Sequence, residues 1–251
     1  MDKNTQKALE FYNKKNYEEA ITYFQKALEF TEIGDFWTFN NIATSYYSLG
    51  QYEHAIEFYL KALELNSKAA DVYLNLANAY KAEGLIGDAI GTLQTAVAAN
   101  PSSMNLHHGL AMLFFEDCQY DLALSELEIV LDNDPVNIDA NYDIARVYYE
   151  MGLYDSAIAH YIKVLDNIDN SADIHYNIAL SYEANNDIDK AIYHLFNVIS
   201  INEAYYPAYK KLGVMFLAKG EKEEAKEYLE KYISFDLPDD EKENIKKILK
   251  K

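Results

Sequence analysis

The chain has 251 residues, of which 41 are Asp or Glu and 22 are Lys or Arg, so its formal net charge is −19. This acidic balance disfavours nucleic acid and anionic membranes as partners. The single cysteine excludes an intrachain disulfide and fits a reducing compartment. We find no apolar leader and no stretch long enough to span a bilayer, so we expect a cytoplasmic protein, although a leader removed beforehand would leave no trace.

Alanine recurs along the chain at a nearly fixed interval, first of 35 residues and then of 34. The repeated alanines are Ala20, Ala55, Ala89, Ala123, Ala157, Ala191 and Ala225. Twelve residues before each stands a second small residue: Ala8, Ala43, Ala77, Ala111, Ala145, Ala179 or Gly213. Two helices cross closely only where neither carries a bulky side chain, so these pairs predict a helix crossing in every repeat. A period of this length is typical of stacked-repeat proteins, in which each repeat is stabilised by its neighbours.

A glycine or an asparagine marks the turn between the two predicted helices in five of the repeats. These residues are Gly50, Gly84, Gly152, Asn186 and Gly220. Both residue types tolerate the left-handed backbone that ends many helices. Lys15 and Cys118 occupy the equivalent places in the first and fourth repeats, where we expect either a small energetic cost or a different cap.

In chain order, the seven predicted helix pairs cover residues 1–35, 36–69, 70–103, 104–137, 138–171, 172–205 and 206–238. The extra residue of the first interval lies near Gly34, where we expect a slightly longer loop. Residues 239–251 are predicted as one more helix, with acidic residues at its start and lysines at its end. Its apolar stripe of Ile245, Ile248 and Leu249 would cover the last repeat, so the chain is expected to be a single array.

The third repeat carries the most complete set of residues spaced as in a known repeat family: Tyr73, Leu76, Ala77, Tyr80, Gly84, Ala89, Ala96 and Pro101. This pattern resembles the tetratricopeptide repeat, and the resemblance extends over all seven repeats. It implies an all-α, right-handed superhelical solenoid of seven antiparallel helix pairs with a C-terminal capping helix. It also implies that the first helix of each pair lines a concave groove. The related pentatricopeptide type, which reads RNA, fits so acidic a chain less well.

Carried over from the family, the groove is expected to display aromatic, amide and charged side chains of the first helices. The candidate peptide-binding residues are Trp37, Asn41, Tyr47, Asn75, Asn78, His108, Met112, Phe115, Asp139, Tyr142, Asp143, Arg146, Tyr149, Glu150, Tyr176 and Asn177, with Lys210 and Lys211 further along. Asn41, Asn75 and Asn177 share one repeat position with Asp143, and amides there can hydrogen-bond an extended peptide backbone without reading its sequence. The alternative is that several of the aromatic rings pack between neighbouring first helices.

Negative charge is concentrated between residues 82 and 189, where nineteen acidic residues face only Arg146 and Lys163, a net of −17. One interpretation is a solvated surface that aids solubility, and the other is a surface that attracts a cationic partner. Arg146 is the basic residue expected in the central groove. It forms either an ordinary ion pair with Asp143 or Glu150, or an anchor for a carbonyl or carboxylate of the ligand.

Two further kinds of site are not expected. The family's best-known groove clamps a C-terminal carboxylate with Lys, Asn and Arg from three repeats, but Asn78 has Leu74 in place of the lysine and no three repeats reproduce the set. No catalytic, cofactor or metal site is predicted, because the six histidines are scattered along the array. His107 and His175 stand where the family has a bulky packing residue, and Cys118 lies in a turn without a nearby cation to activate it.

The sequence therefore predicts a non-enzymatic adaptor that binds a segment of another protein, basic and apolar in character, in its concave groove. The alternative is a scaffold in which copies of the chain associate with one another, or with a larger complex, through convex or end surfaces.

Overall fold

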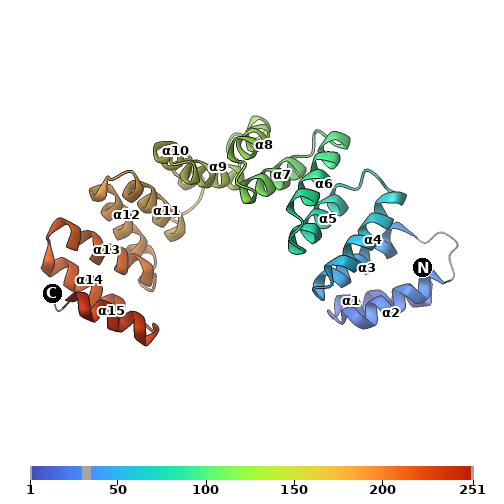
Figure 1. Ribbon diagram of the computed structural model, residues 1–251, viewed down its shortest axis with the longest axis horizontal. Helices are drawn as coiled ribbons and strands as arrows, with labels where there is room; N and C mark the ends of the chain where they lie inside the picture. The colour runs from blue at the N-terminus through green and yellow to red at the C-terminus, as the bar shows by residue number, and fades with distance from the viewer. Residues whose placement is uncertain (1, 30–34, 250–251) are drawn as a thin grey trace. The chain divides into compact units, whose positions relative to one another are not determined.

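The computed structural model describes residues 2–29 and 35–249, and these residues form fifteen α-helices and no strand (Figure 1). The helices are α1 (Lys3–Asn13), α2 (Tyr17–Leu28), α3 (Phe36–Ser48), α4 (Tyr52–Leu65), α5 (Ala70–Ala82), α6 (Ile86–Ala99), α7 (Met104–Glu116), α8 (Tyr120–Asn133), α9 (Ile138–Glu150), α10 (Tyr154–Leu165), α11 (Ala172–Ala184), α12 (Ile188–Ile201), α13 (Tyr206–Lys219), α14 (Lys222–Ile233) and α15 (Asp239–Leu249). The expected all-α class, with seven helix pairs and one further helix, is confirmed. The longer loop predicted at Gly34 and the last two lysines, Lys250 and Lys251, lie outside the described residues.

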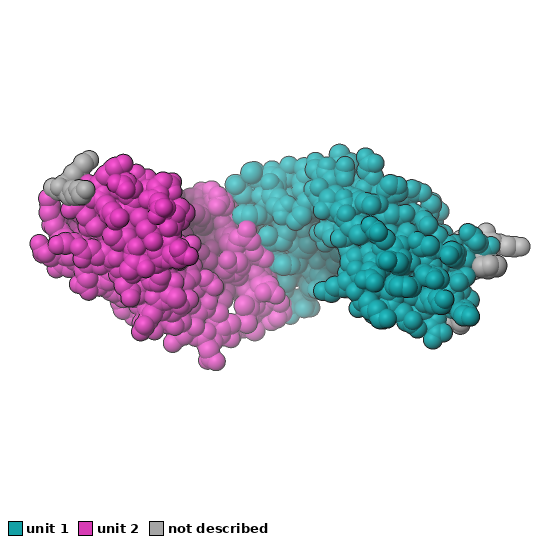
Figure 2. Space-filling model, turned by 90° about the horizontal axis from the view of Figure 1, so that it is seen from below, with its two compact units in different colours: residues 1–133 teal, residues 134–251 magenta. Residues whose placement is uncertain are grey.

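The chain divides into two compact units, residues 1–133 with α1–α8 and residues 134–251 with α9–α15 (Figure 2). Within each unit, every helix packs against its neighbours in the sequence, and the two helices of a pair pack more closely on each other than on the next pair. We call the odd-numbered helices α1 to α13 the first helices of the pairs and the even-numbered ones the second helices. Packing between sequence neighbours is what a stacked array requires, because each repeat buries its apolar face on the next.

All fourteen small residues of the two repeated sets are buried, as the sequence predicted. The last pair, α13 and α14, shows how closely the helices approach. A β-carbon built on Gly213 would lie only 2.5 Å from Cγ of Leu229, which is itself fully buried. The small residues therefore mark the crossing points of the paired helices.

Every first helix ends in the same left-handed turn. The φ angle is 72° to 84° at the four turn glycines and 61° at Asn186. Lys15 (φ 60°) and Cys118 (φ 58°) adopt this conformation as well, so these two repeats keep the common cap and carry the steric cost of a β-carbon there. In all seven repeats the amide of the next residue donates to the carbonyl oxygen five residues earlier, over 2.8 to 3.0 Å.

The C-terminal helix α15 packs against α14. Its predicted apolar stripe is only partly correct, since Ile245 is buried and Leu249 is half-buried, but Ile248 is 39% exposed. Polar contacts also hold its first turn, because Lys210 of α13 and Tyr232 of α14 both donate to the carboxylate of Glu241. The helix therefore brings an acidic side chain to the edge of the last repeat.

Candidate peptide-binding surface

In the second unit, four of the predicted groove residues lie together on α9 and α11. Asn177 donates its amide Nδ2 to the hydroxyl oxygen of Tyr142 over 3.4 Å. The guanidinium carbon of Arg146 lies 5.9 Å from the centre of the Tyr142 ring, and its Nη1 donates to Oδ1 of Asp143 over 2.9 Å. This α9–α11 cluster joins an amide, a phenol and an ion pair on the surface of the first helices.

The carboxylate of Asp143 is paired with Arg146. It is therefore not freely exposed, as the amide side chains at the same repeat position were expected to be. The Asp143 side chain is only 11% exposed, whereas that of Arg146 is 37% exposed. Because a buried carboxylate is costly unless it is paired, the arginine stabilises it. The ion pair predicted for Arg146 thus forms with Asp143, while Glu150 and Asp139 on the same helix are exposed to solvent.

Two predicted groove tyrosines of this unit pack against other rings. The ring centres of Tyr149 and Tyr154 are 5.5 Å apart, and those of Tyr176 and Tyr205 are 5.2 Å apart. Burial is the main cause that raises the pKa of Tyr149 and of Tyr176, so both phenols keep their proton at neutral pH. Both residues are half-buried. Each ring therefore packs against another ring, as the alternative interpretation predicted, and is also partly accessible from solvent.

In the first unit, the predicted groove residues Trp37 and Asn41 line one pocket of about 480 Å³ near the start of α3. Trp37 is 69% exposed, and its ring meets that of Phe36 edge-on with their centres 5.0 Å apart. Asn78 is exposed. The remaining predicted residues of this unit are half-buried: Tyr47, Asn75, His108, Met112 and Phe115.

A pocket of about 470 Å³ in the second unit contains residues that the repeat pattern does not single out. Two lysines of α13 line it, and each forms an ion pair with another helix. Nζ of Lys211 is 2.6 Å from Oε2 of Glu183 on α11, and Nζ of Lys210 is 2.6 Å from Oε1 of Glu241 on α15. The sequence predicts the two lysines on this surface but not their acidic partners. Glu241 lies outside the repeats, 31 residues beyond Lys210.

Polar pairs link first and second helices in both units. Nδ1 of His107 lies 2.6 Å from Oε2 of Glu126, and its Nε2 lies 3.0 Å from the carbonyl oxygen of Pro101. Nδ1 of His175 lies 3.0 Å from Nδ1 of His194. These contacts agree with the packing role predicted for His107 and His175. Over the described parts of the chain, no group of three or more His, Cys, Asp and Glu side chains could hold a metal ion.

His160 forms the same kind of pair with Asn141, whose Oδ1 is 3.0 Å from its Nδ1. Asn141 donates its amide to the carbonyl oxygens of Pro135 and Asn137, so its Oδ1 accepts and the histidine ring donates. Burial lowers the pKa of His160 to about 4, and the ring is neutral at pH 7. The pair is therefore structural at neutral pH.

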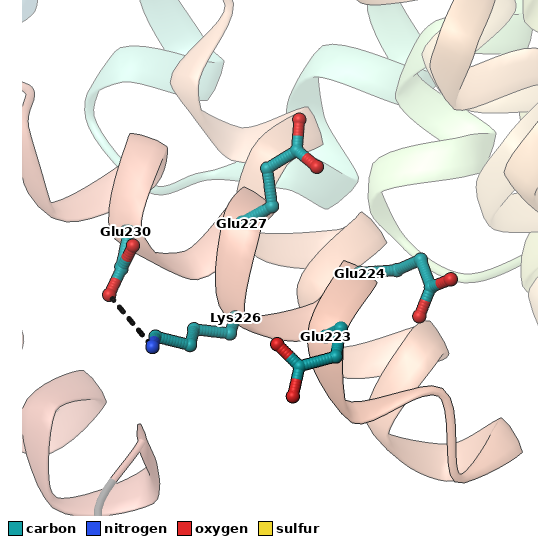
Figure 3. Close-up of a pocket in the computed structure, with 5 residues that line it drawn as sticks. All are labelled: Glu223, Glu224, Lys226, Glu227 and Glu230. Atoms are coloured by element: carbon teal, nitrogen blue, oxygen red, sulfur yellow. Dashed lines mark ion pairs between the residues drawn. The ribbon is translucent and has the colours of Figure 1, made fainter.

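A further hollow lies on the second helix α14 (Figure 3). It is lined by Glu223, Glu224, Lys226, Glu227 and Glu230. All five side chains come from this one helix, and Lys226 lies 4.0 Å from Glu230, the limit of an ion pair. A single row of charges of this kind is typical of a solvated helix face.

Profiles of one repeat family match most of the chain. One described as "TPR repeat" matches residues 43–84, and others described as "Tetratricopeptide repeat" match residues 4–32, 74–138, 114–180 and 206–238. The chain belongs to the tetratricopeptide repeat family. No curated protein sequence matches it.

Solved structures agree with this assignment. The C-terminal part of a TPR repeat-containing protein from Cytophaga hutchinsonii superposes with a TM-score of 0.78 over 92% of this chain and 95% of that one, at 19% identity. A tetratricopeptide repeat protein from Parabacteroides merdae gives 0.71 over 98% and 96%, at 20% identity. At these identities the similarity shows the fold alone.

A third structure, YrrB, is described as a TPR protein with an unusual peptide-binding site. It is 26% identical, with a TM-score of 0.59 over 74% of this chain and 95% of that one. Repeats of this family generally serve as protein interaction modules. Across the residues that the structure describes, no helix is long and apolar enough to cross a membrane.

Proposed function

We propose that this chain is a non-enzymatic adaptor that binds a basic and apolar segment of another protein on the surface of its first helices. The observation that carries the proposal is the α9–α11 cluster, where an amide, a phenol and an arginine lie within the most acidic part of the chain. The peptide-binding site described for YrrB supports the same kind of function. The single exposed thiol, Cys118, supports a reducing compartment, which we take to be the cytoplasm.

Within this surface, Asp139 and Glu150 are proposed to attract the ligand, because both carboxylates are exposed on the helix that carries Arg146. Arg146 is proposed to bond a carbonyl or carboxylate of the ligand with the part of its guanidinium that reaches solvent. Its planar fork and its position over Tyr142 suit that role. The Arg146→Lys variant keeps the charge but loses the fork, so it should bind the ligand less tightly.

The proposal is tested by selecting binders from a random peptide library displayed on phage and measuring their affinity in low and high salt. Selected sequences should be rich in Lys or Arg, and their association should slow steeply as salt is added. The double variant Asp139→Lys/Glu150→Lys should bind them less tightly. The matched control is Asp121→Lys/Glu128→Lys on the second helix α8, which makes the same charge change at exposed residues. Acidic selected peptides, or equal losses in both double variants, would overturn the proposal.

A second candidate is the self-associating scaffold. It is favoured by exposed apolar side chains on second helices, such as Ile162 on α10, which is 41% exposed, and Tyr193 on α12, which is 63% exposed. Sedimentation at rising protein concentration separates the two candidates. A constant monomer supports the adaptor, whereas an oligomer that grows with concentration supports the scaffold.

A further inference from the structure

The pocket of about 470 Å³ in the second unit is built from four helices and has one apolar and one charged half. It is lined by Tyr176, Glu183, Tyr206, Pro207, Lys210, Lys211, Val214, Tyr232 and Glu241. Tyr206 and Val214 are exposed and offer apolar surface at its opening. The two lysines are balanced by the two glutamates, so the lining has no net charge of its own.

One wall of this pocket already holds a cation. The ammonium of Lys210 lies 5.6 Å from the centre of the Tyr232 ring and donates to Oε1 of Glu241 over 2.6 Å. An aromatic face beside a carboxylate is a favourable environment for a positive charge. The protein's own lysine therefore shows which ligand chemistry this wall accepts.

The carboxylate of this wall is held more firmly than the ammonium. Glu241 accepts a second hydrogen bond from the hydroxyl group of Tyr232, whose ring is fully buried. The hydrogen bonds from Lys210 and Tyr232 lower the pKa of Glu241, and burial together with Glu241 raises that of Tyr232, so at neutral pH one stays ionised and the other stays a donor. The Lys210 side chain is 45% exposed on a flexible stem. The cation can leave while the carboxylate and the ring stay in place.

The net charge of the whole chain favours replacement of the Lys210 ammonium by the cation of a ligand. A net charge of −19 attracts basic ligands and repels acidic ones. Among basic side chains, the planar guanidinium of arginine stacks on an aromatic ring and bonds a carboxylate with two N–H groups at once, which an ammonium cannot do.

We propose that this pocket binds an arginine side chain of the partner, whose guanidinium replaces the Lys210 ammonium against Tyr232 and Glu241. The stem of the arginine would then lie along Tyr206 and Val214 at the opening. This inference rests on the proposed function, because it assigns a place to one basic residue of the bound segment. In the free protein, Lys210 acts as an internal competitor for the site.

The test uses the full chain and N-acetyl-arginine amide as the probe, with binding followed by chemical-shift changes in NMR spectra. Lys210→Met removes the competitor and should bind the probe roughly two- to fivefold more tightly, as expected for the loss of one exposed ion pair. Glu241→Gln should bind it more weakly by a similar factor. The matched control is Lys219→Met on the same helix, which makes the same change in net charge outside the pocket and should leave the affinity unchanged.

Three outcomes would overturn the inference. The first is equal or weaker probe binding by Lys210→Met, and the second is an equal gain in Lys219→Met. The third is a preference for N-acetyl-glutamate amide that is lost in Lys210→Met, since it would make the pocket an anion site. Thermal melting of each variant shows whether it remains folded. The probe does not need the α9–α11 cluster. A negative result with the probe therefore does not decide the charge-reversal test under the proposed function, and a negative result in that test does not decide this one.

Discussion

Replacing Gly213 by alanine should destabilise the protein, although the repeat pattern alone suggests the opposite. The six other repeats have alanine at this position, so the substitution restores the common residue. In the structure, however, a β-carbon at Gly213 would lie 2.5 Å from Cγ and 2.6 Å from Cδ2 of Leu229, and 3.3 Å from the carbonyl oxygen of Ala225. Real β-carbons essentially never make contacts as short as the first two, so the fully buried Leu229 would have to shift.

The size of the effect follows from two opposing contributions. Overpacking of a buried contact costs about 1–3 kcal/mol. Removing a glycine from the interior of a helix returns about 0.5–1 kcal/mol, because the unfolded chain loses conformational freedom. The net result for Gly213→Ala should be a loss of about 1 kcal/mol in the free energy of unfolding, within the range expected for a strained core substitution.

The control is the same substitution at Gly91 in α6, where an added β-carbon would meet nothing within 4 Å. Gly91→Ala should therefore gain about 0.5–1 kcal/mol. Urea denaturation followed by far-ultraviolet circular dichroism measures both changes against the parent. If both variants gain stability by the same amount, that result contradicts the close crossing of α13 and α14 described above.

Three further predictions concern turns, crossings and pH. Cys118→Gly should gain about 1 kcal/mol, because it removes a β-carbon from a left-handed turn, and an unchanged urea midpoint would contradict this. Ala157→Leu should cost about 1–3 kcal/mol and Ala20→Leu less, since the first repeat has a neighbour on one side only, and equal melting shifts would argue against stacking. Burial lowers the pKa of both His160 and His194 to about 4, below the ordinary value of 6.5. The unfolded chain therefore binds more protons between these values, so the free energy of unfolding should fall from pH 6.5 to 4, and replacing both histidines by glutamine should flatten that dependence.

The repeat pattern predicts the helices and their crossings because both depend on local spacing. A small residue every 34 residues, with a second one twelve residues before it, is enough to place each crossing. The turn residues are predictable for the same reason, and even Cys118 adopts the backbone conformation of the glycines at its position.

The chemistry of the surface is less predictable, because it depends on which side chains meet across the helices. Asp143 shares a repeat position with Asn41 and Asn177, yet its carboxylate is buried against Arg146. The pocket beside Lys210 depends on Glu241, which belongs to the helix that follows the last repeat and obeys no repeat period. Such pairs follow from the packed structure and not from spacing.

The most direct test of the central claim is hydrogen–deuterium exchange of the full chain with and without a selected basic peptide. Binding on the surface of the first helices predicts slower amide exchange in α9 and α11, with little change in the second helices α10 and α12. Protection confined to α10 and α12 would place the ligand on the opposite face and contradict the proposed adaptor function.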